Sequence, residues 1–179
     1  MLGKRTDGTI ALWAKVAFWP YHLGLRGKLW VQRRTTTEAH FNEIANGWYL
    51  GGWPSRAGLL PPGDLAILDC TCELPFKWDL PYMVLPIWDT KAPTVAQIEE
   101  GVQWAAQQRK AGRTLFVHCA HGHGRSPVLM CAAMIFEGLA KDPRHAEALV
   151  FERRPGIHIN TQQMEALTSW FQMHEARTT

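Results

Sequence analysis

The sequence predicts an α/β fold in which helices flank a central, mainly parallel sheet. Short apolar runs that suit buried strands alternate with longer segments of helical periodicity, an order typical of parallel sheets covered on both faces. Of the 179 residues, 46% are apolar, which excludes a disordered chain and is enough to form one core. We expect one domain over residues 48–179, preceded by a basic, tryptophan-rich segment and connector over residues 1–47.

Three runs in the first half of this domain have strand character and are bounded by turn or loop residues: 48–50, 65–70 and 82–85. Residues 35–47 are mixed and polar, which indicates a connector before the first strand. Pro86 and Pro93 bracket a loop after the third run.

Helical spacing and capping residues dominate the second half. Apolar residues recur at helical spacing from Val95, where Thr94 and Gln97 can form a capping box, and Gly112 ends that helix. A further strand is expected over residues 114–118. Helices are then expected over 126–137, over 142–154 and from Asn160 onward.

Between the last expected strand and its helix lies a run that combines a nucleophile with groups suited to a phosphate: His118-Cys119-Ala120-His121-Gly122-His123-Gly124-Arg125-Ser126. The glycines let backbone N–H groups point inward as an anion nest, and the helix adds the positive end of its dipole. Arg125 can bind two phosphoryl oxygens at once. These surroundings favour a thiolate, so we expect the pKa of Cys119 to lie below the ~8.5 of a free thiol.

A thiolate beneath a bound phosphate indicates in-line attack on phosphorus and a cysteinyl-phosphate intermediate. A glycine turn around a buried cysteine is the alternative interpretation of the same run. The pattern Cys-x5-Arg-Ser, with His directly before Cys, resembles the signature of the cysteine-based protein tyrosine phosphatases, and the short chain resembles their dual-specificity branch. The resemblance extends from about Trp48 to Met173.

The resemblance implies that Cys119 is the nucleophile and that Arg125 binds the phosphoryl group. Ser126 would hydrogen-bond the sulfur and help it leave in the second step, and His118 would orient the loop. The phosphate would be bound by the run that links nucleophile and helix: Ala120, His121, Gly122, His123, Gly124 and Arg125. No metal or other cofactor is implied.

The chemistry also needs an acid that protonates the leaving oxygen and later a base that activates water. Asp89 lies thirty positions before Cys119, which is the distance at which the family supplies an aspartate. Asp79 and Asp69 are alternatives, and any of the three could instead be a turn residue or a helix cap. We expect Asp89 to be the acid.

Other residues near the motif have two interpretations each. Residues 154–163 resemble the segment that supports the phosphate-binding loop in this family, which implies structural roles for Asn160 and Gln163. His121 and His123 could bring pH-dependent positive charge to the pocket mouth or could face solvent. They lack further ligands at any recognisable zinc-site spacing, so no metal site is expected.

Glu73 could pair with Arg125 from behind, but we expect it to be a surface glutamate. The chain has four cysteines without disulfide-framework spacing: Cys70, Cys72, Cys119 and Cys131. A catalytic thiolate needs a reducing compartment, so a cytoplasmic protein is expected. Some relatives keep a cysteine near positions 70–72 that forms a protective disulfide, although we expect two buried spectators.

Charge is concentrated at the amino end. Residues 1–34 hold seven Lys/Arg against one acidic residue, a net charge of +6, whereas the remainder carries −3. The apolar stretch 10–25 is too short and interrupted for a membrane span. Basic residues beside tryptophans fit an interfacial anchor on an anionic membrane, and the alternative is a helix packed against the domain.

The motif without lysines favours phosphoprotein substrates over phosphoinositides, whereas the basic, aromatic amino end favours a phospholipid at a membrane. We expect phosphoproteins, with the phospholipid as the alternative and no nucleic-acid partner. Two other classes are a phospho-binding pseudoenzyme and a rhodanese-type sulfurtransferase. The set Cys119, Arg125 and Asp89 argues against the first, and Ser126 with the spacing of the acid argues against the second.

Overall fold

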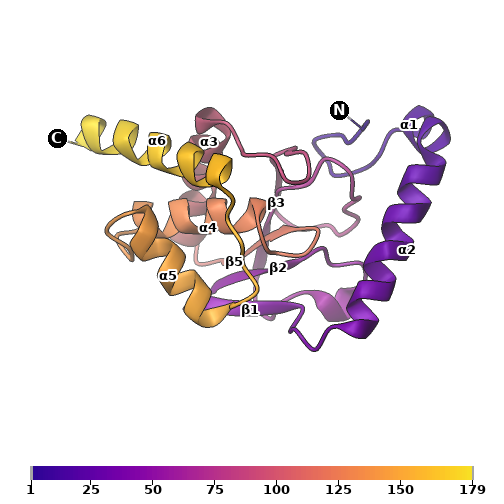
Figure 1. Cartoon of the computed structure of the whole chain (residues 1–179), viewed down its shortest axis with the longest axis horizontal. Helices are drawn as coiled ribbons and strands as arrows, with labels where there is room; N and C mark the ends of the chain where they lie inside the picture. Colours follow the sequence, from indigo (N-terminus) through magenta and orange to yellow (C-terminus); the bar gives the residue numbers. More distant parts are fainter. Residues whose placement is uncertain (1, 179) are drawn as a thin grey trace.

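A five-stranded sheet forms the centre of the computed structural model, which describes residues 2–178 (Figure 1). Its strands are β1 Phe41–Ala45, β2 Trp48–Gly52, β3 Leu65–Asp69, β4 Tyr82–Val84 and β5 Thr114–Cys119. They lie in the order β1-β2-β5-β3-β4, and every neighbouring pair is parallel except β1 with β2. The predicted mainly parallel sheet is confirmed. Because β5 is central, the loop after it opens at the middle of the carboxyl edge of the sheet.

β1 lies within residues 35–47, so the interpretation of this stretch as a connector is wrong, and the sheet begins before residue 48. The strand is short, pairs with β2 alone and is only partly buried, which explains its polar composition. Phe41 anchors it, with its ring centroid 5.8 Å from Tyr49 and 6.1 Å from Phe116. Gly47, with φ of 72°, allows the tight turn into β2.

Three helices pack on one face of the sheet: α3 Val95–Lys110, α4 Arg125–Phe136 and α5 Pro143–Arg153. A further helix, α6 Thr161–Thr178, packs on these three (Figure 1). The main core lies between them and the sheet, and α4 is buried along nearly its whole length, as its composition predicted. The predicted capping box of α3 is present, with Thr94 Oγ1 accepting from the Gln97 N–H at 3.1 Å. The other face of the sheet is covered by aromatic loop residues rather than helices, including Phe76 stacked on Tyr82 at 4.3 Å.

The amino end forms two helices, α1 Leu12–Ala17 and α2 Trp19–Thr35, which lie at the side of the molecule opposite α6 (Figure 1). α2 docks through Leu29, which packs with Trp53, Leu74 and Ala120 beside the loop after β5. The residues before α1 also contact the domain, where the Phe76 N–H donates to the Gly8 carbonyl at 2.9 Å. The amino-terminal segment is therefore part of the wall around the carboxyl edge of the sheet.

Candidate active site

The phosphate loop, residues 119–125, joins the end of β5 to the start of α4. Gly122 has φ of +80°, and a Cβ atom there would lie 2.5 Å from the carbonyl carbon of Gly51. Only glycine fits this turn, which directs the Gly122 N–H at the Cys119 sulfur at 3.2 Å. The loop therefore curls around the thiol at the amino end of a helix, as an anion nest requires.

The environment of Cys119 favours its thiolate. Burial opposes ionisation, but the Arg125 guanidinium, with further contributions from Ser126 and the Gly122 N–H, outweighs it and holds the pKa of Cys119 below its ordinary value. Apart from its contribution to Cys119, the buried Ser126 hydroxyl has no hydrogen-bond partner among the described residues. It is therefore available to the sulfur or to a bound phosphoryl group.

Arg125 is buried and held from behind by Glu73. Its Nη1 and Nη2 atoms donate to the two carboxylate oxygens of Glu73 at 3.0 and 2.8 Å, and Nη1 also donates to the Ile87 carbonyl at 3.0 Å. The expectation that Glu73 is a surface residue is wrong. It follows β3, a parallel neighbour of β5, so the carboxyl ends of the two strands place it behind the phosphate loop.

Asp89 lies across the pocket mouth in the loop between β4 and α3. Its Oδ1 atom is 3.0 Å from Arg125 Nη2, and its side chain is 64% exposed. The pocket of about 210 Å³ that it shares with Cys119 and Arg125 is open to substrate. Asp79 is exposed and does not line this pocket, so of the alternatives considered only Asp89 combines access with proximity to Cys119.

Asn160 and Gln163 hold the loop that carries Asp89. Asn160 Nδ2 donates to the Thr90 carbonyl at 2.9 Å, and Gln163 Nε2 donates to the Lys91 carbonyl at 3.1 Å. Thr90 has φ of 64°, a left-handed conformation that is unfavourable for threonine and that these contacts compensate. Their hydrogen bonds therefore reach the loop that carries Asp89 rather than the phosphate loop.

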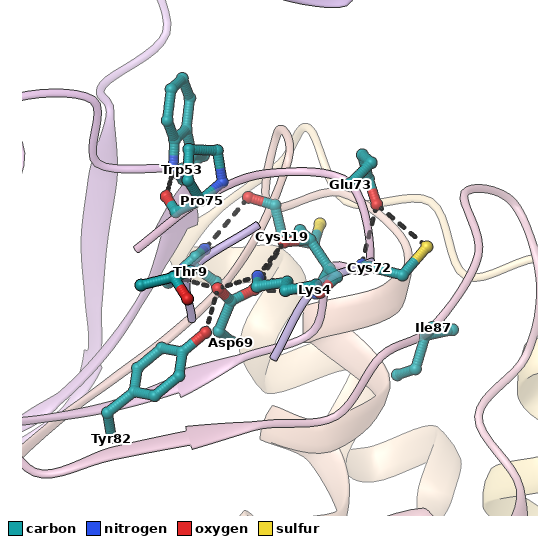
Figure 2. Close-up of polar contacts among 12 residues, drawn as sticks. Lys4, Thr9, Trp53, Asp69, Cys72, Glu73, Pro75, Tyr82, Ile87 and Cys119 are labelled. Carbon is teal, nitrogen blue, oxygen red and sulfur yellow. Dashed lines mark hydrogen bonds and ion pairs between the residues drawn. The ribbon is translucent and has the colours of Figure 1, made fainter. Parts of the chain in front are cut away.

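Asp69 is the third predicted alternative for the acid, but it lies fully buried below the loop (Figure 2). Lys4 Nζ donates to its Oδ2 atom at 2.5 Å, and the Tyr82 hydroxyl donates to the same atom at 2.9 Å. His118 Nε2 is 3.7 Å from that oxygen. Burial alone would raise the pKa of Asp69, but Lys4 and then His118 outweigh it and lower the value. Asp69 is thus a buried carboxylate that binds Lys4 and holds the segment before α1 at the carboxyl end of β3.

His118 is completely buried, which lowers its pKa despite the neighbouring Asp69. Its Nδ1 atom lies 3.4 Å from the Cys119 carbonyl oxygen and has no access to a pocket. This geometry suits a residue that positions the loop, which is the role that the family resemblance implies for it.

Arg154 is a loop-supporting residue that sequence reasoning did not single out. It is buried and donates from Nε to the Gly122 carbonyl at 3.1 Å and from Nη2 to the His121 carbonyl at 2.8 Å. These bonds turn two carbonyl groups away from the pocket, which leaves the N–H groups facing it. The sequence signal that could have identified Arg154 was its position as the first residue of the 154–163 segment, which resembles the loop-supporting segment of the family.

His121 and His123 stack at the pocket mouth with ring centroids 5.8 Å apart. Burial, and then the neighbouring His123, lower the pKa of His121. His123 Nε2 lies 2.7 Å from Glu38, so this ring is tied to the segment before β1. Both rings line the pocket. This placement agrees with the interpretation that puts them at the pocket mouth.

All four cysteines are unpaired and buried. Burial raises the pKa of Cys70 well above its ordinary value, and the pKa of Cys72 rises to about 12 through burial and the adjacent Glu73. Cys119 is the one cysteine with a lowered pKa among the described residues. This contrast favours thiolate character at Cys119 over the other three cysteines.

Residues 65–173 match the family described as dual specificity phosphatase, catalytic domain. The phosphatidylglycerophosphatase and protein-tyrosine phosphatase 1 of Homo sapiens is 31% identical over 90 residues, which are 50% of this chain and 44% of that protein. The protein of the same name from Mus musculus is 32% identical over 88 residues, which are 49% of this chain and 45% of that protein. The matches therefore span less than half the length of these curated relatives.

Solved structures share the fold. PTPMT1 in complex with PI(5)P superposes with a TM-score of 0.69 at 21% identity, covering 78% of this chain and 99% of that chain. Tk-PTP in the active form gives a TM-score of 0.67 at 24% identity, covering 74% and 97%. The family match covers more than half of the sequence and includes the whole phosphate loop. This chain belongs to the dual-specificity phosphatases of the cysteine-based protein tyrosine phosphatase superfamily.

Proposed function

We propose that this protein hydrolyses phosphomonoesters in two steps, with Cys119 as the nucleophile and without a metal ion. The observation that carries the proposal is the convergence of a thiol of lowered pKa, a guanidinium fixed by Glu73 and an accessible carboxylate in one pocket. This set supplies nucleophile, anion binding and acid within reach of one phosphoryl group.

In the first step the Cys119 thiolate attacks phosphorus, an S–P bond forms and the P–O bond to the leaving group breaks. Asp89 donates its proton to the departing oxygen. In the second step a water molecule attacks phosphorus, its proton passes to Asp89, and the S–P bond breaks with release of inorganic phosphate and the thiolate. Ser126, whose buried hydroxyl helps to lower the pKa of Cys119 and has no other hydrogen-bond partner among the described residues, would stabilise that departing thiolate.

Arg125 and the loop N–H groups would stabilise the negative charge on the equatorial oxygens. Glu73 occupies one edge of the guanidinium in this arrangement, and the Nη2 atom near Asp89 faces the pocket. The site is therefore preorganised for one phosphoryl group.

Purified protein is expected to hydrolyse 4-nitrophenyl phosphate at an undiminished rate in excess EDTA, because protein groups carry the charge stabilisation. Phosphate release with and without chelator measures this. Loss of activity in EDTA that added divalent metal restores would contradict the mechanism. Binding of phosphopeptide without any turnover would instead identify a pseudoenzyme.

Asp89→Asn is expected to slow turnover by roughly 10²- to 10⁴-fold for substrates with poor leaving groups, because the leaving oxygen then lacks its acid. The loss should be much smaller with 4-nitrophenolate, which leaves without protonation. Comparing kcat for phenyl and 4-nitrophenyl phosphate measures the difference. Asp79→Asn is the matched control, and an equal loss on both substrates would show that Asp89 is not the acid.

Two substrate classes fit this site. Phosphoproteins are the class that the lysine-free loop favours, and the names of the curated relatives include both a protein-tyrosine phosphatase and a phosphatidylglycerophosphatase. A phospholipid is the second candidate, favoured by the exposed apolar residues of α1 and α2: Leu12, Trp13, Val16, Trp19 and Leu23. We call these five residues the apolar patch.

The apolar patch supports peripheral membrane contact through residues 1–34. Its side chains are more than 60% exposed, and Lys15 and the basic residues of α2 lie on the same two helices. None of the described helices combines the length and apolar character needed to cross a membrane. The four unpaired cysteines support a reducing, cytoplasmic location as a further part of the proposal.

The protein is expected to co-sediment with vesicles that contain anionic lipid and to bind less to purely zwitterionic vesicles. Trp13→Ser/Trp19→Ser should weaken sedimentation about tenfold or more, because two interfacial aromatic side chains are lost. Phe151→Ser removes an exposed aromatic residue from α5 and is the matched control. Equal sedimentation of both variants, or no binding at low salt, would rule out this anchor.

A further inference from the structure

A second cavity of about 680 Å³ adjoins the catalytic pocket. It lies between α2, the segment before β1 and the loop after β2, and Ala120 and His121 of the phosphate loop line both spaces. Its charged lining consists of five arginines and one carboxylate: Arg26, Arg33, Arg34, Arg56, Arg154 and Glu38. The cavity therefore has a large excess of positive charge. We call it the basic cavity.

Two of these arginines serve the fold. Arg154 supports the phosphate loop and pairs with Glu38 at 2.9 Å. Arg33 donates to Ser55 Oγ at 2.9 Å and to the Trp53 carbonyl. Glu38, the one carboxylate, is further occupied by His123. No acidic side chain of the described cavity lining is left to neutralise the remaining cations.

The other three arginines have no such role. The guanidinium groups of Arg26, Arg34 and Arg56 form no hydrogen bond or ion pair with any described residue, and Arg34 stacks over Trp30 at 4.0 Å. Arg56 is close enough to Arg33 to lower its pKa, in addition to the effect of burial. Unpaired cations that repel one another across a cavity favour an anion between them.

His40 adds a polar group to the same wall. Its Nε2 atom is buried without a hydrogen-bond partner among the described residues. Burial, followed by Arg33, His118 and Arg154, lowers the pKa of His40 to about 3, so the ring is neutral at physiological pH. A neutral imidazole with an unused nitrogen can bond to a ligand oxygen in one tautomer.

We propose that the basic cavity binds a second phosphate of the substrate, namely the phosphodiester of a glycerophospholipid whose headgroup ends in the phosphomonoester bound by Arg125. This inference rests on the phosphatase activity proposed above. The two cavities share Ala120 and His121 and therefore adjoin, which is the arrangement that a headgroup with two phosphates requires. Trp30 lines the cavity and is 56% exposed on α2, the helix that also carries part of the apolar patch. A lipid held there presents its acyl chains toward an apolar helix surface.

The test compares two lipids in detergent micelles, which separate headgroup recognition from vesicle binding. One is dioleoyl phosphatidic acid, which has a phosphomonoester alone. The other is a dioleoyl glycerophospholipid with a phosphodiester followed by a terminal phosphomonoester. Arg34→Gln/Arg56→Gln should lower the ratio of their kcat/KM values, second lipid to first, about a hundredfold, because each charge-assisted contact is worth about tenfold. Lys110→Gln/Lys141→Gln removes two charges outside the cavity lining and should leave the ratio unchanged.

An unchanged ratio in the arginine variant, or an equal loss on both lipids, would overturn the proposal. A doubly phosphorylated peptide is assayed alongside the two lipids. If the arginine variant loses kcat/KM on this peptide alone, the proposal is also overturned and the cavity is assigned to phosphoproteins. If the wild-type protein does not turn over 4-nitrophenyl phosphate, the proposed function fails separately. The cavity is then tested by calorimetry with the short-chain dibutyroyl form of the second lipid and Cys119→Ser protein. The Kd of this lipid should be about a hundredfold higher for Cys119→Ser protein that also carries Arg34→Gln/Arg56→Gln. An unchanged Kd would contradict the site.

Discussion

Cys119→Ser is expected to reduce phosphomonoester turnover by roughly 10⁶-fold, the scale seen when a covalent enzyme loses its nucleophile. A serine hydroxyl at this position is not ionised near neutral pH, whereas Arg125 and the loop N–H groups lower the pKa of the Cys119 thiol. Phosphate binding should persist, because the nest and Arg125 remain. Steady-state release of phosphate measures the loss of turnover, and calorimetric titration with inorganic phosphate measures the retained binding. Acid-quench capture of covalently bound phosphate tests for the cysteinyl-phosphate intermediate.

Cys131→Ala is the matched control, since Cys131 is a buried cysteine of α4 whose pKa is raised by burial. It should retain turnover and should still yield the phosphorylated intermediate under acid quench. Substantial turnover by Cys119→Ser, or a wild-type protein that never carries phosphate during turnover, would refute covalent catalysis by Cys119.

Lys4→Met is expected to lower the free energy of unfolding by about 3–5 kcal/mol, because it leaves the buried Asp69 carboxylate without its counterion. The Lys4 and Asp69 side chains are 1% and 0% exposed, so water cannot replace the lost ammonium group. For a chain of this length the loss corresponds to a fall in Tm of roughly 10 °C. Chemical denaturation followed by tryptophan fluorescence measures it.

The pH dependence of this loss distinguishes the ion pair from lost packing. Lys4 lowers the pKa of Asp69 in the folded protein, so the ion-pair stabilisation is present above the pKa of an unfolded aspartate and is lost as the pH falls. The difference between wild type and Lys4→Met should therefore shrink below about pH 4. Asp69→Asn should recover part of the loss in a double-mutant cycle, and Lys15→Met should cost little because Lys15 is exposed. A loss that is the same at every pH would indicate packing alone.

The order of strands and helices was predictable because most elements carry their own local signals. The strands over 65–69 and 114–119 contain the continuous apolar runs 65–68 and 115–117, and α3 carries both a capping box and helical spacing. β1 was missed because an edge strand is half exposed, so its sequence resembles that of a polar connector. Coverage of the second sheet face by Phe76 and other loop aromatics was missed for a related reason, since loops have no periodicity.

The candidate site divides in the same way. Cys119 and Arg125 lie in one continuous motif whose backbone geometry is local, and Asp89 could be proposed from its spacing. Glu73 and Arg154 could not be recognised, because each is a charged side chain whose partner is distant in sequence and whose burial depends on packing. A charged residue at the surface and one in a buried ion pair look alike in sequence.

The sequence by itself determined the family, the phosphate loop and the strong positive charge of the amino end, since all three are local or compositional properties. Only the tertiary structure decided what that charge does. It places Lys4 against the buried Asp69 and lines the basic cavity with the unpaired Arg26 and Arg34 of α2, where Arg56 from the loop after β2 joins them. The physical reason is that the function of a charge depends on its burial and its partners, which the packing of α2 and the carboxyl ends of the parallel strands create.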